Sequence, residues 1–186
     1  MAIHPPSNKI WWNERVKRSE LIWILIAFVW GLVMFFTMIY WHAFGQQNLS
    51  NEAYRTTPEA YAAKAEAMVD DYQVGEEGDT GFPVVHPPPG SDAYIIARQF
   101  EWWPVLELEK DKQYRLHLSS MDVQHGFSLQ PININIQVQP GYEMVLTVTP
   151  DQAGDFSIVC NEFCGLGHHV MVGRIHVVEG GQGGAK

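Results

Sequence analysis

The residues most able to do chemistry lie near the C-terminal end of the chain. Cys160 and Cys164 are four residues apart, His168 follows four residues after the second cysteine, and Met171 three residues after that. A further histidine, His125, lies upstream in the segment MDVQHGF. Thiolate and thioether sulfur select copper, and imidazole also suits it. Because both cysteines of the chain lie here, the pattern predicts a copper site.

Other uses of the two cysteines must be compared with a copper site. A disulfide is the ordinary expectation in an extracytoplasmic domain, but a bridge across so short a loop constrains little of the unfolded chain. Zinc sites rarely use methionine. A mononuclear blue-copper site needs one Cys, two His and an axial Met, which leaves one thiolate over. Two coppers with bridging sulfurs use the whole set, while a disulfide and a single copper stay open as alternatives.

In order and spacing these five residues resemble subunit II of the heme-copper oxygen reductases, the cytochrome c oxidases, which carries the dinuclear copper centre called CuA. The resemblance implies that Cys160 and Cys164 are the bridging thiolates. It also implies that His125 and His168 are the terminal imidazoles, one for each copper, and that Met171 is a weak ligand of one copper.

Two further residues of the segment need an assignment. The resemblance implies that the backbone carbonyl of Glu162 binds the other copper, and that its carboxylate reaches a magnesium or manganese ion at the contact with subunit I. His169 is the alternative to His168, but its spacing from Cys164 differs by one residue from the family pattern, and adjacent residues point apart. We therefore expect His168 to be the ligand.

Several neighbours could support the ligands. Asp122 and Phe163 are candidates for side chains that orient them. Gly165 and Gly167 allow tight turns in the ligand loop, although both can equally be ordinary loop residues.

An aromatic cluster occupies residues 100–104, FEWWP. In the family that it resembles, an aromatic segment at this place lies over the copper site and receives electrons from the donor, which makes Trp102 and Trp103 the candidates. Core packing is the alternative. Two consecutive tryptophans on a strand cannot both face the core, so we expect at least one at the surface or at an interface.

A membrane anchor is expected near the N-terminus. Residues 21–41, LIWILIAFVWGLVMFFTMIYW, carry no charge, and at about 1.5 Å per residue they span the hydrocarbon core of about 30 Å. No small-residue cleavage site follows, which favours an anchor over a signal peptide. Aromatic residues flank the span: Trp11, Trp12, Tyr40 and Trp41. The basic residues Lys9, Arg15, Lys17 and Arg18 precede it, so we expect a cytoplasmic N-terminus and an external copper domain at the cell membrane.

Charge suggests two further roles. An acid near the inner edge of the helix resembles the start of the proton path in single-helix subunit II proteins, with Glu20 as the candidate and Glu14 as the fallback. The formal net charge is −9, and an external acidic surface could steer a basic cytochrome c, or it could simply keep the domain soluble. No basic stripe for nucleic acid is present.

The rest of the sequence indicates a mainly β fold. We expect a cytoplasmic N-terminus over 1–20, a single transmembrane helix over 21–42, a linker over 43–90, a cupredoxin-like Greek-key β-barrel with CuA over 91–179, and a disordered tail over 180–186. The linker contains one predicted helix over 60–72, preceded by Thr57-Pro58-Glu59. Short strands are predicted at 94–97, 114–118, 132–138, 144–148 and 173–178.

The expected function is electron delivery. CuA would take electrons from cytochrome c or a small copper protein and pass them to heme in subunit I, which reduces O2 to water and pumps protons. The single helix resembles the b-type members of the family, although a glutamate at position 162 is more typical of the two-helix members. A nitric oxide reductase subunit and a membrane-tethered copper-binding or delivery protein are the alternatives.

Overall fold

The structure is a computed structural model that describes residues 15–45 and 51–181. It divides into two compact units, 1–48 and 49–186, and each is described by itself. Four sequence-based expectations fall outside the described residues: the basic residue Lys9, the aromatic pair Trp11 and Trp12, the acid Glu14, and residues 182–186 of the tail.

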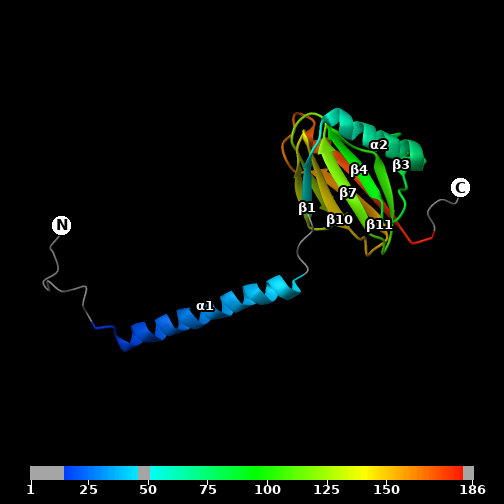
Figure 1. The fold of residues 1–186 in the computed structure, drawn as a ribbon. Coiled ribbons are helices and arrows are strands. Elements are labelled where there is room, and N and C mark those ends of the chain that lie inside the picture. Colours follow the sequence, from blue (N-terminus) through cyan, green and yellow to red (C-terminus); the bar gives the residue numbers. More distant parts are fainter. Residues whose placement is uncertain (1–14, 46–50, 182–186) are drawn as a thin grey trace, which may run out of the picture. The chain divides into compact units, whose positions relative to one another are not determined.

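The first unit contains one long helix, α1 (Arg18–Phe44), of 27 residues (Figure 1). It includes the whole span expected over 21–42, and within the described residues it is the one helix whose length and composition suit a membrane crossing. Its first turn is closed by Glu20, whose carboxylate accepts a hydrogen bond from the backbone N–H of Lys17 at 2.7 Å. Glu20 therefore has a capping role in this structure.

The second unit is built from two β-sheets. The first sheet has the strand order β1 (Asn51–Arg55), β10 (Tyr142–Val148), β7 (Tyr114–Ser120), β4 (Asp92–Arg98) and β5 (Glu101–Trp103). The second has the order β2 (Gln73–Glu76), β3 (Pro83–Val85), β6 (Val105–Glu109), β12 (Val172–Val178), β11 (Gly154–Cys160), β8 (His125–Gln130) and β9 (Ile134–Val138).

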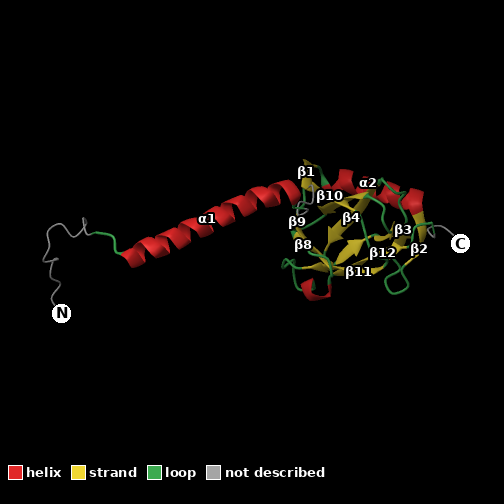
Figure 2. Ribbon diagram, turned by 90° about the horizontal axis from the view of Figure 1, so that it is seen from below, coloured by secondary structure: helices red, strands yellow, loops and turns green. Residues whose placement is uncertain are grey.

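The two sheets face each other as the layers of a sandwich (Figure 2). Leu118 and Ile95 from the first sheet and Leu106 and Ile158 from the second belong to one buried core. The mainly β, cupredoxin-like prediction is confirmed, but the sheets do not join into the closed barrel that we expected. No backbone ladder among the described residues links the edge strands of one sheet to those of the other, so a β-sandwich is the correct description.

The helix expected over 60–72 forms as α2 (Pro58–Tyr72). Thr57 caps it by accepting a hydrogen bond from the backbone N–H of Ala60 at 3.2 Å. Its buried side chains recur at helical spacing: Tyr61, Ala65, Met68 and Val69. The Tyr61 hydroxyl donates to the carbonyl of Ile95 at 3.0 Å, which fixes the helix against β4 (Figure 1).

Much of the segment expected as a linker is built into the sheets. β1 pairs with β10 over five residues, and β3 pairs in parallel with β6. The expected domain start at residue 91 therefore comes after three strands and a helix that are already part of the folded unit. These strands are too short to show alternation, and β1 and β3 pair with strands that come later in the sequence, β10 and β6.

Candidate metal centre

The potential ligands gather at one end of the sandwich. His125 is the first residue of β8 and Cys160 is the last residue of β11, and these two strands are antiparallel neighbours. The loop after Cys160 turns back through the short helix η2 (His168–Val170), and Met171 lies directly before β12. Two adjacent strands and one connecting loop therefore supply the predicted set.

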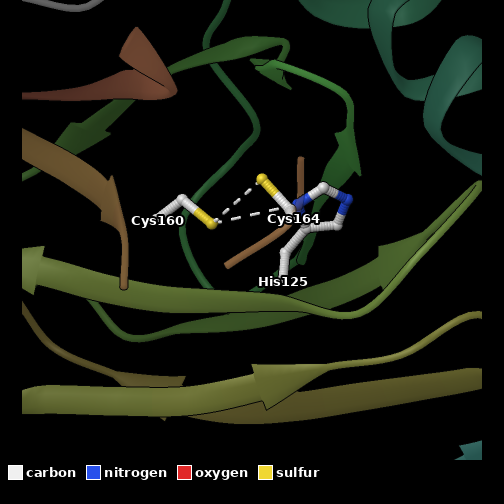
Figure 3. Close-up of side chains that lie close together, drawn as sticks. All are labelled: His125, Cys160 and Cys164. Atoms are coloured by element: carbon white, nitrogen blue, oxygen red, sulfur yellow. Dashed lines mark hydrogen bonds between the residues drawn. The ribbon is translucent and has the colours of Figure 1, made fainter. Parts of the chain in front are cut away.

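The two cysteines are buried free thiols, with their sulfur atoms 3.8 Å apart. The Sγ atom of Cys160 also lies 3.9 Å from Nδ1 of His125, whose side chain is fully buried. Figure 3 shows the three side chains converging, with the Cys160 sulfur facing both partners. One possible ligand atom from each residue lies within 4.8 Å of the others, which makes a compact group of potential metal ligands.

The remaining predicted residues approach the same sulfur atoms. The Sγ atom of Cys164 lies 3.6 Å from Nδ1 of His168 and 3.6 Å from Sδ of Met171. The backbone carbonyl of Glu162 accepts a contact from the Cys160 thiol at 3.2 Å. His169 is exposed, and none of the contacts recorded for the described residues joins it to a sulfur atom.

Asp122 holds the imidazole of His125. Its Oδ1 lies 2.8 Å from Nε2 of His125, which leaves Nδ1 as the nitrogen that faces the sulfur atoms. Burial alone would raise the pKa of Asp122, but hydrogen bonds from His125 and from the backbone of Gln99 and Val123 outweigh it and lower that pKa below its ordinary value. The carboxylate therefore stays ionised and orients the ring.

Burial is also the main influence on Cys164. Together with the neighbouring thiol of Cys160, it raises the pKa of Cys164 to about 11. In the metal-free protein this sulfur carries a proton at neutral pH.

The aromatic candidates differ in exposure. Trp102 is only 1% exposed, and its ring lies 6.1 Å from that of His125 and 5.6 Å from that of Phe127. The side chain of Trp102 is thus a core residue beneath His125, whereas Trp103 is half-buried. Phe163, which we expected to support the ligands, is 79% exposed, with its ring 5.9 Å from that of His168.

The Glu162 side chain is half-buried and accepts a hydrogen bond from the Gln137 amide at 3.1 Å.

The sequence did not predict two residues that support the site, Gly126 and Gln99. A Cβ atom on Gly126 would overlap the side-chain oxygen of Asn161 and lie 2.9 Å from the backbone nitrogen of Glu162, so any larger residue there would force this loop to shift. Gln99 donates from its side chain to the carbonyl of Cys164. No spacing or periodicity marks either residue, because both act on a loop far away in the sequence.

Comparison with known proteins gives consistent relationships. Residues 96–178 match the family described as cytochrome c oxidase subunit II, periplasmic domain. Cytochrome c oxidase subunit 2 of Thermus thermophilus is 35% identical over 116 residues, which are 60% of this chain and 86% of the relative. The probable cytochrome c oxidase subunit 2 of Streptomyces coelicolor is 39% identical over 75 residues, 40% of this chain and 24% of the relative.

A solved structure shares the fold. A chain of a heme-copper terminal oxidase dimer superposes with a TM-score of 0.54 at 23% identity, covering 87% of this chain and 100% of that chain. At 23% identity the superposition supports a shared fold only. The family relationship rests on the sequence relatives.

Proposed function

The chain belongs to the cytochrome c oxidase subunit II family, and from this membership we propose that its β domain holds a dinuclear CuA centre that relays electrons. As a member, it is a subunit of a heme-copper oxidase complex with a copper-binding cupredoxin-like domain. The observation that carries the proposal is the pair of free thiols 3.8 Å apart, each facing an imidazole nitrogen.

The donor set fits two copper ions better than one. On the side of Cys160 lie the imidazole of His125 and the carbonyl of Glu162. On the side of Cys164 lie the imidazole of His168 and the thioether of Met171. Each side therefore offers one imidazole and one weaker ligand, with the sulfur atoms between them. A mononuclear blue-copper site would leave one of these thiols without a role.

When bound, copper would supply reversible one-electron exchange at this end of the domain. The chain contributes a rigid support: buried Met171 and His125 exclude water, and Asp122 fixes the orientation of the ring. The exposed Phe163 beside His168 offers an apolar contact at the edge of the site. Half-buried Trp103 is the better candidate for receiving electrons from a partner, because Trp102 does not reach the surface.

The proposed route begins at cytochrome c or a small copper protein outside the cell membrane. It ends at heme in subunit I, which reduces O2 to water and pumps protons. We further propose that α1 anchors the subunit with its N-terminus in the cytoplasm, where Glu20 marks the start of a proton path. The Glu162 carboxylate is the candidate for a magnesium or manganese ion at the subunit I contact.

Electron paramagnetic resonance of the copper-loaded full chain in detergent tests the centre. We expect a mixed-valence signal in which the electron is shared by two equivalent copper nuclei. Cys160→Ser and Cys164→Ser should each abolish it, because either change removes a shared sulfur. A signal split by one copper nucleus in the parent protein would overturn the proposal.

A further inference from the structure

We propose that Gln99 is a positioning residue of the metal centre. Gln99 joins the segment bearing His125 to the loop bearing Cys164. The inference rests on the proposed function, because it concerns the same site. It adds a residue that is not among the ligands and lies in a third segment of the chain, between β4 and β5.

Gln99 lies at the end of the sandwich that holds the ligands. It occupies the two-residue turn with Phe100 that connects β4 to β5, where Arg98 pairs with Glu101 in the antiparallel ladder. An ion pair between the side chains of Arg98 and Glu101 closes the same turn. The neighbouring β7 runs parallel to β4 and continues into the segment of Asp122 and His125, so this segment and the turn lie side by side.

Two groups of Gln99 point to two different ligand segments. Its backbone N–H donates to Oδ2 of Asp122 at 2.7 Å, and the other carboxylate oxygen of Asp122 meets Nε2 of His125 at 2.8 Å. Its side-chain amide donates to the backbone carbonyl of Cys164. One residue thus fixes the orientation of an imidazole and the position of a cysteine that come from separate parts of the chain.

The ligand loop lies so close to this turn that the contact leaves no spare room. A Cβ atom on Gly165 would come within 2.8 Å of the Gln99 amide nitrogen, and Gly165 has a φ of +135°, which favours glycine. A Cβ atom on Gly167 would overlap the ring of Phe100. These glycines, expected only to help the loop turn, let it lie directly on residues 99 and 100.

The consequence is a centre whose geometry depends on a residue that binds no metal. The backbone N–H of residue 99 survives any substitution except proline, so the bond to Asp122 can persist while the side-chain bond is removed. Changing Gln99 should therefore loosen the Cys164 side of the site and leave the His125 side in place. Outer partners of metal ligands typically change metal affinity by about 10-fold to 100-fold.

The test compares Gln99→Leu and Gln99→Glu with the parent full chain in detergent. Leucine removes the donor at similar volume, and glutamate places an oxygen against the Cys164 carbonyl. Gln73→Leu is the matched control, because the exposed Gln73 amide also donates to a backbone carbonyl, that of Gly75, at 3.2 Å in β2. We expect copper transfer to a chelator to become about 10-fold faster in both Gln99 variants and to stay unchanged in the control.

Two further measurements separate positioning from general stability. The reduction potential and copper spectrum of both Gln99 variants should shift from the parent. In the metal-free chain, alkylation of Cys164, located by mass spectrometry, should be several-fold faster than in the parent. If Gln99→Leu only lowers the free energy of unfolding and leaves copper release, potential and Cys164 alkylation as in the parent, the inference is wrong. If the parent shows no two-copper signal, the proposed function fails instead, and Cys164 alkylation still decides the role of Gln99.

Discussion

His168 and His169 have the same side chain, and the fold alone gives them different surroundings. Nδ1 of His168 lies 3.6 Å from the Cys164 sulfur, while His169 is exposed. We predict that His168→Ala abolishes the dinuclear copper signal expected of the proposed centre, because one copper would lose its only imidazole. His169→Ala should leave the signal nearly unchanged. Electron paramagnetic resonance of both variants measures this, and the reverse result would show that our ligand assignment is wrong.

Gly126 is a second residue whose role depends on a close approach. A Cβ atom there would overlap the Asn161 side chain and lie 2.9 Å from the backbone nitrogen of Glu162. We predict that Gly126→Ala lowers the free energy of unfolding by about 1–3 kcal/mol and weakens copper retention, because the ligand loop must shift. Urea unfolding followed by tryptophan fluorescence measures the first effect.

The control is Gly75→Ala, since a Cβ atom on Gly75 meets nothing within 4 Å. Equal destabilisation by the two substitutions would contradict a specific role for Gly126.

At the residue scale the sequence predicted the candidate ligands and Asp122 as a support for them, but it did not predict Gln99. Cys160, Cys164, His168 and Met171 share one loop, so their types and spacing can be read directly from the chain. The contact from Gln99 to Cys164 joins residues from different hairpins. Such a contact depends on which strands become neighbours, and no local pattern encodes it.

At the element scale, β12 is tied to the turn after β2 by a charged cluster. His176 Nε2 lies 3.1 Å from a carboxylate oxygen of Glu77, and His176 Nδ1 lies 2.6 Å from Asp155. Burial alone would lower the pKa of His176, but its hydrogen bonds to the carboxylates of Asp155 and Glu77 outweigh burial and raise that pKa above its ordinary value. Burial likewise opposes, but does not cancel, the lowering of the Glu77 pKa by His176 and Arg174.

The sign of the pH dependence follows from the raised pKa. A protonated His176 is favoured in the folded state, so its contribution is complete below about pH 6.5 and is lost as the pH rises through the folded pKa. We predict that His176→Gln lowers the free energy of unfolding by about 1 kcal/mol near pH 6 and by less near pH 9. Urea unfolding of parent and variant at both pH values measures the difference.

Asp155→Asn is the companion variant for this cluster. The Asp155 side chain is 81% exposed, so solvent screens its ion pair with His176. We therefore expect Asp155→Asn to lower the free energy of unfolding by less than removal of the half-buried Glu77 carboxylate would. A loss for His176→Gln that is larger at high pH than at low pH would contradict the assignment.

The helices and strands themselves show which elements could be predicted from the sequence. α2 has a cap, a first-turn proline and apolar residues at helical spacing, and β9 alternates cleanly, so local patterns specify both. β9 still begins at Ile134, two residues later than predicted. β1, β2 and β3 have three to five residues each, and each is paired in a sheet: β1 with β10, β3 with β6, and β2 with β3. Their pairing, and the sandwich rather than a barrel, depend on contacts between distant segments.

At the scale of the whole molecule, the chain combines an apolar helix with an acidic folded domain. The 27 residues of α1 make a helix that is long and apolar enough to cross a membrane. Of the residues expected to face the cytoplasm, Arg15, Lys17 and Arg18 lie at its start. Such an anchor fits a subunit that acts in a membrane complex.

The acidic composition gives a prediction for the electron donor. The chain has 21 acidic residues against 12 basic ones, and most of the acids follow the helix. A cytochrome c with a basic face would therefore be attracted over long distances, and salt would screen the attraction because the Debye length falls to about 10 Å at 0.1 M. We predict that the second-order rate of electron uptake from such a donor falls at least about 10-fold between roughly 10 mM and 300 mM salt.

Stopped-flow absorbance of the copper-loaded protein measures this rate. An uncharged small-molecule reductant is the control, since its encounter rate should not depend on ionic strength. A rate that stays level or rises with salt for the basic donor would mean that apolar contacts, such as those available at exposed Phe163 and Leu166, dominate the encounter. The negative charge would then serve solubility, and the donor would recognise the edge of the copper site by shape and apolar surface.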